Sequence, residues 1–191
     1  MNFSTAWQQL IDQIHRPDKV ADAKAAINEA IAVLSSRPFA RDSASATLTL
    51  VSTDYLQGID VTTSPFTRFK KVKWLRPTGY KKMVTFRDPA KIFLNGHECL
   101  DVYYIEGTNL IFKLSALQSA AYCGYFQYHA PLVATSDTDW MLDMMWPCVS
   151  AYALKTLFGQ IGDDQERARY DAEYLRLWDI AFRDLGDGTE A

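Results

Sequence analysis

The sequence YDAEYLRLWDIAFRDL, residues 170–185, carries the most regular pattern in the chain. Its apolar residues recur at i, i+4, i+7, i+8, i+11 and i+15, the spacing of one face of an α-helix. They are Tyr170, Tyr174, Leu177, Trp178, Ala181 and Leu185. Charged side chains fill the opposite face. A helix with this much aromatic surface on one face needs a packing partner, so we expect other helices beside it.

The residues before this helix predict two more helical segments, within a stretch that runs from Asp137 to Leu185. Proline disfavours helical geometry in the residue before it, so Trp146-Pro147 either kinks one helix or divides two. We expect a division, with a short helix over Asp139–Met145 and a longer one over Pro147–Phe158.

The first 36 residues predict two more helices. Apolar residues at helical spacing indicate a helix over residues 4–15, with Ser4 or Thr5 as its N-cap and Arg16-Pro17 at its end. Asp18 then caps an alanine-rich helix that ends at Leu34. This pair is the expected partner of the C-terminal helices.

The middle of the chain changes from helical period to the alternation typical of strands. A hairpin is indicated where DVYYI and LIFKL flank Glu106-Gly107-Thr108-Asn109. We expect an antiparallel meander of about five to seven strands, forming one sheet or a small sandwich. The predicted strands are Thr47–Ser52, Phe69–Leu75, Lys81–Phe86, Asp101–Ile105, Leu110–Leu114 and Ala121–Tyr128.

These elements together predict an α+β fold: a helical bundle formed by the N- and C-terminal helices, with an inserted antiparallel β-sheet region. We expect one domain over residues 1–191, because this length suits a single core. Its helices lie at about 4–36 and 137–185, the β insert at about 45–129, and a short tail at 186–191.

Composition indicates a globular protein with an uneven distribution of charge. Among 191 residues the net charge is −3. Residues 61–87 contain eight basic and no acidic residues, which leaves 12 basic and 23 acidic residues elsewhere, a net of −11. No secretory leader or apolar run long enough to span a membrane is visible. Three scattered cysteines predict buried, reduced thiols.

No motif predicts catalysis, a metal site or a cofactor. The three histidines, His15, His97 and His129, lie on different predicted elements, and the His97-Cys99 pair has no companion ligands. Asp137, Asp139 and Asp143 lie near a helix start, where the first two are better explained as caps. We therefore expect a protein that is not an enzyme.

One stretch combines positive charge with aromatic residues. Its candidate contact residues are Arg68, Lys70, Lys71, Lys73, Arg76, Lys81 and Lys82, followed by Arg87 and interleaved with Phe66, Phe69, Trp74, Tyr80 and Phe86. Cations that meet phosphates and rings that stack on bases are typical of nucleic-acid grooves. A solvated sheet face and a contact with an acidic protein neighbour use the same residues, so all three interpretations stay open.

The order of elements resembles the head-to-tail adaptor proteins of tailed bacteriophages, also called connector or head-completion proteins. The resemblance covers most of residues 1–185. It lies in two helices, the hairpin YYIEGTNLIFKLSAL, a strand ending in QYHAPL, the helix start TSDTDW and the late aromatic helix.

This resemblance implies a structural virion protein that forms a ring, commonly of twelve subunits, joins the portal to the tail and extends the DNA channel. Its partners would be the portal protein, a downstream tail protein and genomic DNA, which passes without sequence-specific binding, with no membrane involved. Such a protein resides in the host cytoplasm during assembly and at the head–tail interface of the virion. The matching portal-docking tail is Gly186, Asp187, Gly188, Thr189, Glu190 and Ala191.

Two other functions fit the same sequence. A tail-completion or tail-terminator protein would share these features and bind the tail tube instead of the portal. A non-specific nucleic-acid-binding module would use the basic stretch 68–87 and lose affinity steeply with salt.

Overall fold

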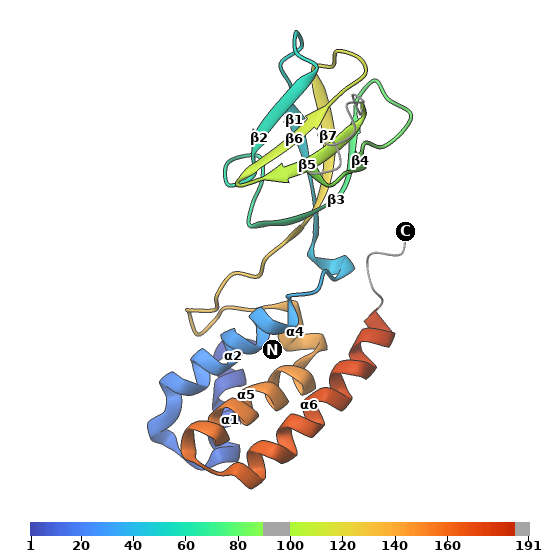
Figure 1. The fold of residues 1–191 in the computed structure, drawn as a ribbon. Coiled ribbons are helices and arrows are strands. Elements are labelled where there is room, and N and C mark those ends of the chain that lie inside the picture. The colour runs from blue at the N-terminus through green and yellow to red at the C-terminus, as the bar shows by residue number, and fades with distance from the viewer. Residues whose placement is uncertain (90–99, 186–191) are drawn as a thin grey trace. The chain divides into compact units, whose positions relative to one another are not determined.

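The computed structural model describes residues 1–89 and 100–185, and side chains within these ranges up to Ala181. The chain is α+β, with helices from both ends and sheets from the middle, which confirms the predicted fold class (Figure 1). It forms two compact units. We call residues 1–40 with 129–185 the helical unit, and residues 41–128 the sheet unit.

The helical unit is built around α5. This helix packs against α6, α2, α1 and α4, so the expected pairing of N- and C-terminal helices is confirmed (Figure 1). The helices are α1 (Phe3–Ile14), α2 (Val20–Leu34), α4 (Trp140–Met144), α5 (Trp146–Ile161) and α6 (Asp164–Leu185), with a 3₁₀ turn, η1, at Pro17–Lys19.

The aromatic face of α6 packs on the core of this unit, as predicted. Tyr174 is buried, and its ring meets Tyr152 of α5 edge-on, with ring centres 5.2 Å apart. Tyr170 stacks on Phe158 at 5.5 Å. Small residues of α2, which include Ala23, Ala26 and Ala30, are fully buried and allow α5 to approach closely.

Two of the predicted helix caps are wrong. Asn2, not Ser4 or Thr5, is the N-cap of α1, because its side-chain oxygen accepts the Thr5 N–H. Asp18 does not cap α2: it lies in η1 and forms an ion pair with Arg16. Since Pro17 begins the 3₁₀ turn, α2 starts two residues after Asp18 and has no side-chain cap.

The predicted division at Trp146-Pro147 is confirmed, because α4 ends and α5 begins there. Asp139 is the N-cap of α4, and its Oδ1 accepts the Met141 N–H at 2.8 Å. The Asp137 prediction is wrong in detail. Its carboxylate accepts the N–H groups of Val133 and Ala134 in the preceding loop, so it closes a turn.

The sheet unit contains two sheets. One has the strand order β1-β7-β3, and the other β2-β6-β5-β4, in which β4 is parallel to β5. The strands are β1 (Ser43–Thr49), β2 (Leu56–Asp60), β3 (Phe69–Pro77), β4 (Thr85–Phe86), β5 (Val102–Glu106), β6 (Asn109–Lys113) and β7 (Ala120–Gln127).

This topology corrects the predicted meander. Among the described strands only β5 and β6 form a hairpin of sequence neighbours, and β7 instead lies between β1 and β3. β2 was not predicted, and the expected strand at 81–86 is reduced to Thr85–Phe86. The β5–β6 turn is as predicted, with Gly107 at a φ of +59° that favours glycine.

The two sheets share one core. Leu75 and Cys123 of the three-stranded sheet are fully buried in the same cluster as Leu110 and Phe112 of the other sheet. One face of each sheet is therefore inside, and the opposite face of β1-β7-β3 is left as an outer face.

Candidate interaction surfaces

The outer face of the three-stranded sheet is defined by strand register, because directly paired residues lie on the same side. β1 contributes hydroxyl residues, the central strand β7 contributes aromatic residues, and β3 contributes cations and a tryptophan. Residues paired across the three strands form the rows of this face, which are Thr47–Tyr122–Arg76, Ser45–Gly124–Trp74 and Ser43–Phe126–Lys71. Tyr128 follows just after the end of β7. We call this set, with Lys70 and Lys73, the outer face.

Two irregularities in β3 place additional cations beside this face. The register with β7 shifts between Phe69 and Lys71 and again between Val72 and Trp74. Each shift is a β-bulge that inserts one extra residue, and the extra residues are Lys70 and Lys73. The bulges explain why the cations of this stretch do not alternate regularly in the sequence.

At the middle of the face, the indole of Trp74 lies close to Gly124. A Cβ atom built on Gly124 would be 2.3 Å from the indole Nε1 and 2.4 Å from Cε2. Only glycine leaves room for this approach. The indole of Trp74 therefore occupies the space in which a side chain at position 124 would lie.

Cations lie over the other rings of the face. Lys73 Nζ is 5.6 Å from the centre of Phe126, Lys70 Nζ is 5.7 Å from Tyr128, and the Arg76 guanidinium is 5.7 Å from Tyr122. Tyr122 and Tyr128 are 41% and 53% exposed, so both keep surface for a ligand. Burial lowers the pKa of Lys70, the nearby Asp42 carboxylate raises it, and Lys71 lowers it.

The other predicted contact residues are Arg68, whose carbonyl accepts the Tyr128 N–H at 2.8 Å beside the outer face, and Lys81 and Lys82, which lie outside its rows. Arg68 occupies the turn before β3, at a φ of +48°. Lys81 and Lys82 are exposed after β3, in a segment that also exposes Met83 (59%), Phe86 (60%) and Arg87. We call residues 81–87 the 81–87 segment. The structure thus divides the predicted basic stretch into two surfaces of different chemistry.

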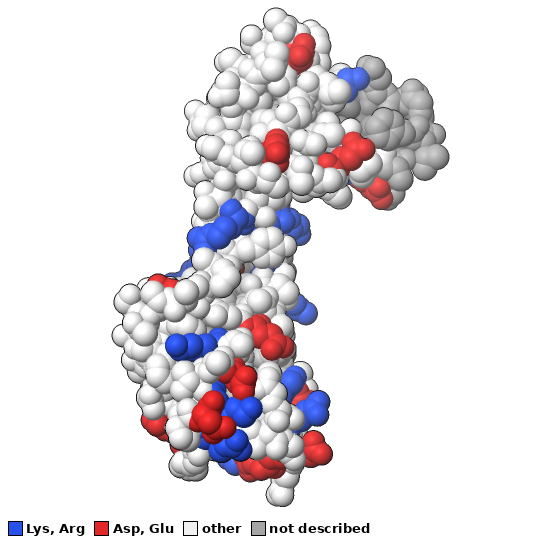
Figure 2. Space-filling view, turned by 90° about the vertical axis from the view of Figure 1, so that its left-hand side faces the viewer, with Lys and Arg blue, Asp and Glu red and all other residues white. Residues whose placement is uncertain are grey.

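Charge is divided between the units. Residues 41–128 contain 11 basic and 7 acidic residues, a net of +4, and the rest of the chain contains 9 basic and 16 acidic residues, a net of −7. On the face drawn in Figure 2, acidic and basic side chains intermingle over the helices, and most of the visible surface of the sheet unit is uncharged. Most of the basic side chains visible on that unit gather at one end of it, and another lies apart from them.

The acidic and histidine candidates have structural roles. Asp139 Oδ2 lies 2.6 Å from His129 Nδ1, and both side chains are largely buried. Asp143 pairs with the amino group of Met1, and His15 ends α1 in the left-handed conformation. Within the described ranges no group of three His, Cys, Asp or Glu could hold a metal ion. His97, Cys99 and the predicted docking tail 186–191 lie outside those ranges.

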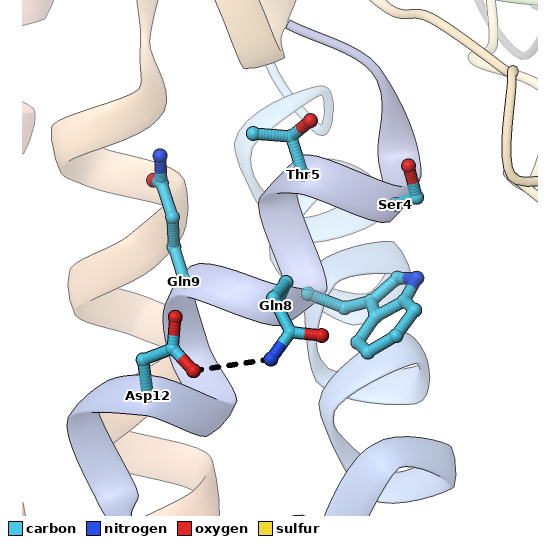
Figure 3. Close-up of a pocket in the computed structure, with 6 residues that line it drawn as sticks. Ser4, Thr5, Gln8, Gln9 and Asp12 are labelled. Atoms are coloured by element: carbon cyan, nitrogen blue, oxygen red, sulfur yellow. Dashed lines mark hydrogen bonds between the residues drawn. The ribbon is translucent and has the colours of Figure 1, made fainter.

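Described residues of the helical unit line two of the surface pockets of the structure. One, of about 470 Å³, is lined entirely by α1, where Gln8 donates to Asp12 at 3.0 Å (Figure 3). The other, of about 340 Å³, lies between α2, α5 and α6, near the hydrogen bond from Tyr152 to Glu29. Neither combines a nucleophile, a base and a buried wall, so neither indicates a reaction.

Cys123 and Cys148 are buried, as predicted for structural thiols. Burial raises the pKa of Cys123 to about 12 and of Cys148 to about 11, so both are protonated near neutral pH. The raised thiol pKa stabilises the folded state at pH values below 9.0, the ordinary pKa of a cysteine. This stabilisation is lost as the pH rises through the pKa of the thiol in the folded state.

We expect neither thiol to be alkylated by iodoacetamide at pH 8 in the folded protein, because the thiolate is the reactive form. Both should react fully in urea. Peptide mass spectrometry before and after denaturation checks this. Rapid labelling of Cys123 or Cys148 in the folded state would contradict the burial described for them.

Within residues 1–89 and 100–185, no helix is long and apolar enough to cross a membrane. No protein-family model matches the chain, and no curated protein matches it in sequence.

Proposed function

We propose that this chain is a structural protein of a tailed-bacteriophage virion, which forms a ring between the portal and the tail and extends the DNA channel. The observation that carries the proposal is the division of charge, with +4 on the sheet unit and −7 on the rest of the chain. A ring made by one repeated contact needs two different and complementary surfaces on every subunit. The order of elements supports the same assignment through its resemblance to head-to-tail adaptors.

The 81–87 segment is the surface we propose for contact with the next subunit. Met83 and Phe86 supply exposed apolar area, and Lys81, Lys82 and Arg87 supply a cationic rim. Methionine and aromatic residues are enriched at protein interfaces. The acidic helical unit of the neighbouring copy is the complementary partner, and residues 186–191 are proposed to dock on the portal.

Mixing the purified protein with its portal protein and imaging the particles tests this function. We expect a ring of this chain stacked on the portal ring. Absence of such a particle under assembly conditions would contradict the proposal, and binding to the tail tube instead would favour a tail-completion or tail-terminator protein.

The double variant Lys81→Glu/Lys82→Glu should weaken ring assembly at least tenfold, about 1.4 kcal/mol, because it reverses the rim charge. Lys71→Glu/Lys73→Glu makes the same change in net charge on the outer face and is the matched control. Analytical ultracentrifugation of both variants with the portal gives the comparison. If the two variants assemble equally well, the 81–87 segment does not form the contact between subunits.

A further inference from the structure

We infer that the outer face of the three-stranded sheet binds single-stranded nucleic acid without reading its sequence. This inference does not depend on the adaptor function, because it concerns a surface of the isolated chain. It begins with the composition of the face, whose rows contain hydroxyl, aromatic and cationic side chains and no carboxylate. Each of these three classes contacts a different part of a nucleotide chain.

Cations and hydroxyls suit the phosphates. Lys71, Lys73 and Arg76 are exposed along β3, and Ser43, Ser45 and Thr47 are exposed along β1. Lysine and arginine neutralise phosphates, and serine and threonine hydroxyls donate hydrogen bonds to them. Both edges of the face therefore present phosphate ligands, with the rings between them.

The rings suit unpaired bases. Trp74 is partly exposed and lies so close to Gly124 that a Cβ atom there would collide with its indole, and we assign this ring as a stacking surface. Tyr122 is exposed in the neighbouring row, two residues from Gly124, and alternate strand residues are about 7 Å apart. Bases stack on aromatic side chains only when they are not paired in a duplex, which favours a single strand.

A protein partner fits the face less well. Lysine is depleted at protein interfaces, and three of the four cations here are lysines: Lys70, Lys71 and Lys73. The 81–87 segment also contains two lysines, but it exposes the wholly apolar side chains of Met83 and Phe86, whereas the exposed rings of the outer face, Tyr122 and Tyr128, carry polar hydroxyls. Contacts to phosphates and stacking on rings are common to all four nucleotides, so binding should be sequence-independent.

Fluorescence titration tests the inference directly. Trp74 is the one tryptophan among residues 41–128, and the other four lie in the helical unit. The full chain is titrated with oligothymidylate and oligouridylate of about 16 nucleotides. Both should quench Trp74, because phosphate and base are common to them, and Trp74→Phe should remove that quenching. The logarithm of affinity should fall with the logarithm of salt with a slope of roughly −2 to −3, as expected for three or four phosphates.

Matched charge variants separate the face from net charge. Lys71→Glu/Lys73→Glu should weaken binding more than tenfold, and Lys81→Glu/Lys82→Glu, with the same change in charge, less than threefold. Circular dichroism melting confirms that both variants fold. Three results would overturn the inference: no binding of either oligomer at low salt, equal losses in the two variants, or a duplex or polyglutamate that binds as tightly as the oligomers.

Discussion

Replacing Asp139 by alanine should lower the free energy of unfolding of the helical unit by about 3 kcal/mol, because the change removes one partner of a buried pair. Its carboxylate caps α4 through Met141 N and approaches His129 Nδ1 at 2.6 Å, with side-chain exposures of 11% for Asp139 and 7% for His129. Loss of the cap alone is worth about 1 kcal/mol. Urea denaturation followed by far-ultraviolet circular dichroism at neutral pH measures the change.

Asp12→Ala is the matched control for this experiment. Asp12 is exposed on α1 and accepts a hydrogen bond from Gln8, so its loss should change stability by less than about 0.5 kcal/mol. A loss below about 1 kcal/mol for Asp139→Ala would show that the His129 contact adds nothing to the cap.

Gly124→Val should lower the stability of the sheet unit by roughly 1–3 kcal/mol and displace Trp74 from the outer face. The new Cβ would overlap the indole, whose Nε1 is 2.3 Å from the ideal Cβ position, and a rigid ring can yield only by rotating away. Thermal melting and Trp74 fluorescence measure the two effects.

Gly58→Val provides a matched control in the same unit. Gly58 lies within β2, and a Cβ there would meet no atom within 4 Å, so valine should be tolerated. In the Trp74→Ala background, Gly124→Val should cost much less, because the obstructing ring is gone. A Gly124→Val protein as stable as Gly58→Val would contradict the close approach of Trp74.

The helices were predictable because their signals are local. The 3.6-residue period of α6, the Pro147 boundary and the Asp139 cap each depend on residues close together in the chain. The wrong caps failed for an equally local reason. Asn2 precedes both residues that were considered for α1, and the turn that begins at Pro17 occupies the place where Asp18 was expected to cap.

The sheets were less predictable because their pairing is not local. Ser43 pairs with Phe126 across most of the sheet unit, and no pattern within either strand specifies that partner. β2 was missed because its five residues include Gly58 and no regular alternation, and its position depends on pairing with β6.

The candidate surfaces were partly visible in the sequence. The concentration of cations and rings at residues 66–87 is a feature of composition, so the sequence alone could single out these residues as candidates for contact. The division of these residues into two surfaces depends on the bulges at Lys70 and Lys73 and on the approach of Trp74 to Gly124. Gly124 belongs to a strand about 50 residues later in the sequence. Such contacts follow only from the three-dimensional fold.

Native mass spectrometry of the protein mixed with its portal is the most direct test of the proposed adaptor function. A ring of twelve 21.7-kDa subunits would add about 260 kDa to the portal. We predict a complex whose added mass is a whole multiple of the subunit mass and corresponds to a complete ring. Separate portal and single-chain species under the same assembly conditions would contradict the account.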